Sequence, residues 1–89
     1  MQTEKKVTFN NSLEIATDKK FSVVIDEEKD MVHFLGTLEL DIVSLLLKEK
    51  LTYSQVFENI SKEYEDCSKE ELYKFLDELL EKDILVIVK

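Results

Sequence analysis

Two side chains in this sequence have the chemistry of a catalyst or a metal ligand, and each is the only residue of its type. His33 stands inside a predicted strand, where an imidazole could act as a general acid or base. Cys67 directly precedes a predicted helix, whose N-terminus can lower a thiol pKa. We expect His33 to be a packing or surface residue and Cys67 a small apolar contact. With no nucleophile–base pair and no second histidine, the sequence predicts no enzyme, no metal site and no cofactor.

The carboxylates cluster without forming a recognisable ligand set. The segment "DEEKD" at Asp26–Asp30 lacks the spacing of a calcium-binding loop. It is predicted to be the solvated tip of a hairpin. The segment "EYEDCSKEEL" is predicted to be a polar loop followed by an acidic first helical turn, which the helix dipole favours.

The charge balance of the chain indicates which classes of binding partner to expect. Twenty acidic residues stand against 12 lysines, with no arginine, for a net charge of −8. Nucleic acids and anionic membranes attract clustered cations, so we expect neither as a partner, although Leu35–Ile60 has the outline of a helix-turn-helix. A small winged-helix transcriptional regulator or a protein-interaction module remains the alternative. No apolar run is long enough for a signal peptide or a membrane span, which predicts a cytoplasmic protein.

The first third of the chain predicts an antiparallel sheet. Residues 1–6 are expected to be disordered. Apolar and β-branched residues predict strands at Phe21–Asp26 and Met31–Leu35, joined by the hairpin tip. A third strand comes from either "VTFN" at 7–10 or "LEIAT" at 13–17, with "DKK" at 18–20 as its turn.

The remainder predicts three helices and an extended end. The first helix covers Thr37–Lys48, and the second begins at Thr52, which forms a capping box with Gln55. Ser68 and Glu71 predict the same box for the third helix. The residues at 84–88 are expected to form a strand or an extended tail. The predicted apolar faces are Leu38, Ile42, Leu45 and Leu46; Val56, Phe57, Ile60 and Tyr64; and Leu72, Phe75, Leu76, Leu79 and Leu80.

These elements predict one α+β domain over residues 1–89. Its fold class is winged helix-turn-helix-like, with an N-terminal three-stranded antiparallel sheet followed by three helices. A sheet in so short a chain has edges, and an edge strand offers unpaired backbone groups to an extended peptide. The Met31–Leu35 strand is apolar and lacks proline, so it suits this task, or pairing with a second copy as a homodimer. An ordinary core strand has the same pattern.

Phe34-Leu35-Gly36-Thr37 stands at the end of a predicted strand, and Ile42-Val43 and Leu45-Leu46 are paired apolar residues of the predicted first helix. In these segments the chain resembles the PqqD-like family, whose strand ends and whose first helix has paired apolar residues at the same places. "LTYSQVFENISKEY" is similar to the second-helix segment, and "EELYKFLDELLEKDILV" to the third helix with its exit. The resemblance extends over Phe21–Val88.

The resemblance implies a stand-alone RiPP recognition element. Such a protein is a non-catalytic peptide chaperone, which binds the leader of a ribosomally synthesised precursor peptide by strand addition. It presents that leader to a separate modifying enzyme, here expected to be a radical SAM enzyme. The leader would lie between the third strand and the third helix, with Tyr73 the most exposed helix contact and Lys69 and Lys74 facing acidic leader residues. The implied peptide-binding residues are Met31, Val32, His33, Phe34, Leu35, Lys69, Leu72, Tyr73, Leu76 and Leu80.

Overall fold

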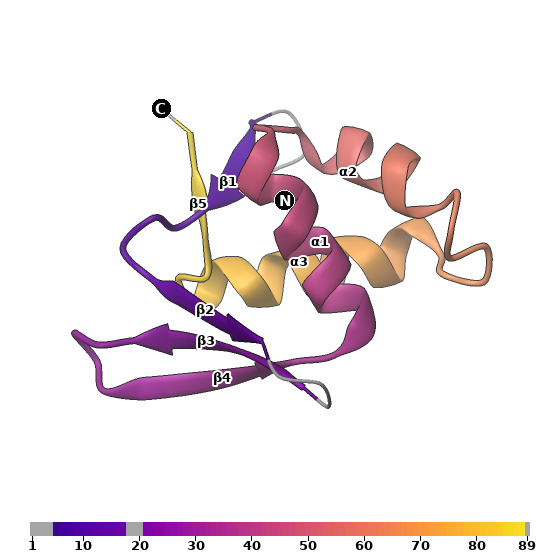
Figure 1. The fold of residues 1–89 in the computed structure, drawn as a ribbon. Helices are drawn as coiled ribbons and strands as arrows, with labels where there is room; N and C mark the ends of the chain where they lie inside the picture. The colour runs from indigo at the N-terminus through magenta and orange to yellow at the C-terminus, as the bar shows by residue number, and fades with distance from the viewer. Residues whose placement is uncertain (1–4, 18–20, 89) are drawn as a thin grey trace.

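The protein has an α+β fold, which a computed structural model describes for residues 5–17 and 21–88. In this part of the chain, three helices pack with a three-stranded sheet and a two-stranded sheet (Figure 1). The elements are β1 (Val7–Phe9), β2 (Glu14–Thr17), β3 (Ser22–Asp26), β4 (Met31–Leu35), α1 (Thr37–Lys48), α2 (Tyr53–Ile60), α3 (Lys69–Glu81) and β5 (Leu85–Ile87). The predicted α+β class is confirmed.

The three-stranded sheet is antiparallel, with the order β2-β3-β4. Val24, at its centre, pairs with Ile15 on β2 and with His33 on β4. The predicted strands at 21–26 and 31–35 are therefore present, and "LEIAT" supplies the third. The predicted turn at 18–20 lies outside the described residues, as do residues 1–4 of the segment expected to be disordered.

β1 does not join this sheet. It pairs antiparallel with β5, and Val7 lies opposite Ile87. On its other side, Val7 exchanges two backbone hydrogen bonds with Leu51, of 2.7 and 3.2 Å, in the turn between α1 and α2. Of the two alternatives for the third strand of the sheet, "VTFN" was therefore wrong. This segment forms β1, which precedes the three-stranded sheet in the sequence. The apolar segment at 84–88 forms a strand because β1 provides its partner.

The helix boundaries follow local capping signals. The Thr52 hydroxyl accepts from the Gln55 N–H at 3.3 Å, and the Gln55 side chain accepts from the Thr52 N–H at 3.0 Å. Ser68 accepts from the Glu71 N–H at 3.2 Å, while its own hydroxyl donates to the Glu71 carboxylate. The Thr52 box is thus complete, whereas only half of the Ser68 box is formed. α2 ends at Ile60, so Tyr64 lies beyond the helix whose apolar face it was predicted to extend.

The hydrophobic core lies between the helices and one face of each sheet. Both β1 and β5 bury residues in it, and Val24 and Leu35 contribute from the three-stranded sheet. Burying these side chains is the main free-energy gain available to a chain of this length. The fully buried members are Val7, Val24, Ile42, Val43, Leu46, Tyr53, Val56, Leu72, Leu76, Leu79, Ile84 and Leu85.

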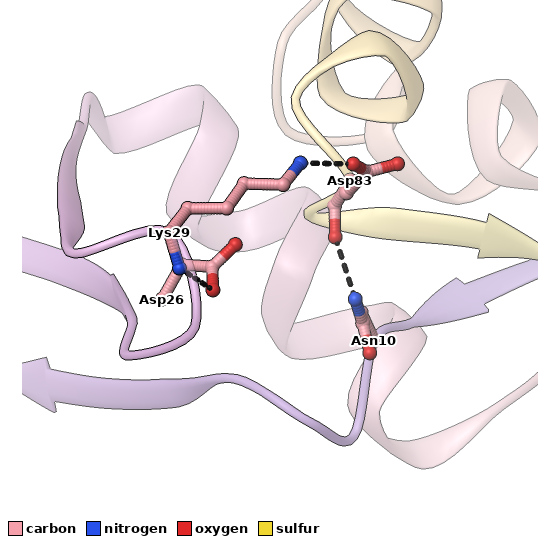
Figure 2. Close-up of polar contacts among 4 residues, drawn as sticks. All are labelled: Asn10, Asp26, Lys29 and Asp83. Carbon is pink, nitrogen blue, oxygen red and sulfur yellow. Dashed lines mark hydrogen bonds and ion pairs between the residues drawn. The ribbon is translucent and has the colours of Figure 1, made fainter.

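A polar contact joins the three-stranded sheet to the corner between α3 and β5 (Figure 2). The Lys29 ammonium, in the β3–β4 turn, forms an ion pair with the Asp83 carboxylate. The Asn10 side-chain amide donates to the Asp83 carbonyl at 2.9 Å, and the Lys29 N–H donates to the Asp26 carboxylate at 3.2 Å. This contact holds the turn from which β4 begins.

Candidate functional site

β4 is an edge strand of the three-stranded sheet. Among the described strands it pairs with β3 alone, along the full register from Met31 to Leu35. Its other side therefore offers backbone N–H and C=O groups that no described strand uses. Such an edge can accept an extended peptide as a further strand.

The side chains of β4 divide between the two faces of the sheet. Met31, His33 and Leu35 point to the inner face that carries buried Val24, because successive strand residues alternate. Val32 and Phe34 point to the opposite face. Met31 is 46% exposed, Val32 53% and Phe34 70%, whereas Leu35 is buried. A core strand would bury more of these residues, so the exposure favours a strand that is available for binding.

The face that carries Val32 and Phe34 is apolar. Phe21, just before β3, is half exposed and packs edge-to-face on Phe34, with ring centroids 5.8 Å apart. Val23 pairs with Phe34, and Ile25 pairs with Val32. We call this surface the outer sheet face; its apolar members are Ala16, Phe21, Val23, Ile25, Val32 and Phe34.

His33 contributes to the inner side of β4. Its Nε2 atom is buried and has no hydrogen-bond partner among the described residues. His33 is half-buried and pairs with Val24, which agrees with the expected role of a packing or surface residue.

The predicted contacts on α3 are largely part of the core. Leu72 and Leu76 are fully buried, and Leu80 is partly buried against the core. Tyr73, expected to be the most exposed, is only 7% exposed, so that expectation was wrong. The reason is that α2 covers it: the Tyr73 ring packs edge-to-face on Tyr53, with centroids 5.2 Å apart.

Two surface hollows lie along α3. The larger, about 550 Å³, is lined by Ser68, Lys69, Glu70, Glu71, Tyr73, Lys74 and Asp77. The smaller, about 160 Å³, is lined by Glu71, Lys74, Phe75 and Glu78. Neither includes a β4 residue. The structure therefore brings Lys69 and Tyr73 together in one hollow on α3. The five β4 residues of the predicted site lie together on the strand and line neither hollow.

The charges in the larger hollow are mixed. The Lys69 ammonium lies 5.5 Å from the centroid of the Tyr73 ring, close enough for a cation–π contact. Glu70, Glu71 and Asp77 line the same hollow as Lys69 and Lys74. Acidic leader residues would therefore meet carboxylates as well as lysines here.

The remaining features were checked for a reactive thiol, a metal site and a membrane span. Partial burial, followed by the charge of Glu71, raises the pKa of the Cys67 thiol, which disfavours a nucleophilic thiolate. No three or more His, Cys, Asp or Glu side chains gather as a metal site within residues 5–17 and 21–88. Over the same ranges, no helix is long and apolar enough to cross a membrane.

Phe21 was predicted to lie in a strand but not to belong to a site, and the structure places it on the surface. The period of two along Phe21, Val23 and Ile25 places all three on one face, and Phe34 belongs to that face through its pairing with Val23. That signal was present in the sequence. Only the strand register shows that the two phenylalanine rings meet.

Comparisons with protein-family models, curated proteins and solved structures found no match to this chain. The candidate site consequently rests on geometry: a free edge at β4, apolar side chains on it, and an adjoining apolar sheet face.

Proposed function

We propose that this protein is a non-catalytic peptide chaperone that binds an extended peptide by strand addition at the free edge of β4. The observation that carries the proposal is the exposure of apolar side chains, Met31, Val32 and Phe34, on a strand that pairs with β3 alone among the described strands. Exposed apolar edge strands are a risk of aggregation, and proteins usually shorten, charge or cover them. An edge left apolar and uncovered is suited to a partner strand.

The bound peptide is the leader of a ribosomally synthesised precursor. Two features support this assignment: the resemblance of Phe21–Val88 to PqqD-like proteins, and a described order of three-stranded sheet followed by three helices. We assign the fold to the winged helix-turn-helix type on the same grounds. In this role the protein presents the leader, in the cytoplasm, to a separate modifying enzyme of the radical SAM class.

Strand addition accounts for both affinity and selectivity. Backbone hydrogen bonds to β4 form with any extended sequence, while neighbouring side chains choose among sequences. The leader is ordered only on binding, and the entropy lost by that ordering limits the affinity. The apolar side chains of β4 offset this cost by becoming buried under the added strand.

The test is a titration of isotope-labelled protein with the leader segment of a precursor peptide encoded beside it, followed by nuclear magnetic resonance. We expect the amide resonances of Met31–Leu35 to shift and their hydrogen exchange to slow. Amides of α2, such as that of Glu58, serve as the internal control and should not move. A β4 whose amides stay unchanged at saturating leader would refute the proposal.

A further inference from the structure

The outer sheet face continues to the free edge of β4. Val32 and Phe34 belong to both, since they lie on β4 and point to the outer face. Phe21 packs on Phe34, so the two aromatic rings form a ridge beside the edge. Glu14, which pairs with Ile25, is the charged side chain among the described positions of this face. An added strand would thus meet an apolar surface on this side.

The geometry of strand addition selects the residues that meet this surface. Alternate residues of an added strand point to the outer face. Two of them, at positions i and i+2 of the peptide, lie beside Val32 and Phe34. Cross-strand neighbours of this kind touch, and apolar or aromatic pairs stabilise the sheet. Apolar residues at positions i and i+2 of the peptide would cover the exposed surface of Phe34.

The negative charge at one end of β4 favours a basic residue in the bound peptide. The β3–β4 turn, which leads into Met31, exposes the carboxylates of Glu27, Glu28 and Asp30. Its lysine is already paired with Asp83. A basic residue of the peptide at this end would be attracted, whereas a second copy of the chain would bring another net charge of −8. Charge complementarity therefore favours a basic peptide over self-association.

We infer that the outer sheet face reads the sequence of the bound peptide; this inference rests on the proposed strand addition at β4. The peptide class is an extended segment with apolar side chains at i and i+2 on the outer face. It carries lysine or arginine at the end that lies beside the β3–β4 turn. Specificity then comes from Val32, Phe34 and the acidic turn.

A display library of random peptides, selected on the wild-type protein, tests this inference. We expect the selected peptides to show the i, i+2 apolar alternation with lysine or arginine at one end, and to shift the amides of β4. Phe34→Ser and Val32→Thr should each weaken their binding, Phe34→Ser by about tenfold. Leu47→Ser, which changes an equally apolar exposed side chain on α1, should leave binding unchanged.

The charge requirement has its own matched pair of variants. Glu27→Gln with Glu28→Gln should weaken binding and reduce its dependence on salt, because the attraction is between exposed charges. Glu58→Gln with Glu65→Gln makes the same change of charge at exposed positions away from the turn, and should have no effect. Melting curves establish that each variant is folded before binding is compared.

The outcomes separate this inference from the proposed function. Selected peptides that shift β4 amides yet bind Phe34→Ser and the Glu27/Glu28 variant like the wild type would overturn the inference and leave strand addition intact. If no selected peptide shifts a β4 amide, both are wrong. A dimer in sedimentation that Phe34→Ser dissociates would show that the face is occupied by a second copy, and would also overturn the inference.

Discussion

Lys29 and Asp83, 54 residues apart in the sequence, form an ion pair that joins the β3–β4 turn to the corner between α3 and β5. Both side chains are about half exposed, at 49% and 54%. Exposed ion pairs contribute little to global stability, so the role of this pair is local. It fixes the turn from which the candidate peptide-binding strand begins.

Removing this ion pair should loosen the start of β4 and leave the fold intact. In Lys29→Gln we expect faster amide exchange at Met31 and Val32, because the turn loses its contact with Asp83. Hydrogen exchange measured by nuclear magnetic resonance checks this. Lys62→Gln, which makes the same charge change elsewhere, should leave β4 exchange unchanged; equal effects from the two variants would contradict the local role.

Two tyrosine hydroxyls make the stability of the folded protein depend on pH in the alkaline range. The bond that the Tyr64 hydroxyl donates to Asp41 raises the pKa of Tyr64 to about 12 from its ordinary value of 10. Burial, and then a 2.7 Å bond to Asp77, raise the pKa of Tyr53 as well. The unfolded chain therefore ionises first, so this stabilisation is complete below pH 10 and is lost as pH rises.

We expect the melting temperature to fall as the pH is raised from 10 to about 12, over the window set by Tyr64. In Tyr64→Phe the fall should be shallower, because this phenol no longer ionises in the unfolded chain. Circular dichroism melting at several alkaline pH values measures both slopes. Identical slopes in wild type and variant would show that the Asp41 bond has no such effect.

Leu76 holds the core rather than a peptide surface. It is fully buried, so Leu76→Ala should lower the free energy of unfolding by about 2–5 kcal/mol through lost burial and a residual cavity. Leu47→Ala, at a half-exposed apolar position of α1, should change it by less than about 1 kcal/mol. Urea denaturation compares the two. A small loss in Leu76→Ala would mean that this face of α3 is open to a ligand.

The start of α2 depends on the Thr52 side chain. Thr52→Ala removes the acceptor for the Gln55 N–H and should cost about 1 kcal/mol of stability. Ser44→Ala, at an exposed position inside α1, removes a hydroxyl that caps no helix and serves as the control. Urea denaturation again gives the difference. Equal stabilities of the two variants would contradict the capping role.

Local signals explain how much of the fold was predictable. The bounds of α1 at Thr37 and Lys48 and the caps at Thr52 and Ser68 depend on residues a few positions apart, and the sequence displays them directly. β1 could not be assigned in the same way. Its partner, β5, lies at the other end of the described chain, and a short apolar run does not identify a distant partner.

The candidate site was predictable in part for the same reason. The β4 segment Met31–Leu35 follows from alternation and from its neighbour β3. The burial of Tyr73 does not, because it depends on the way α2 places Tyr53 against α3. The ridge of Phe21 and Phe34 likewise required the register between β3 and β4.

The pairing of β1 with β5 determines how the molecule would respond to mechanical force. The bond from the Val88 N–H to the Lys6 carbonyl, 2.9 Å long, stands at the outer end of this antiparallel pair, beside both ends of the described chain. Tension between those ends would load that bond first and then the following ones in turn, as in a zipper. Pulling would therefore separate β1 and β5 at low force, and the β2-β3-β4 sheet would come under load only afterwards.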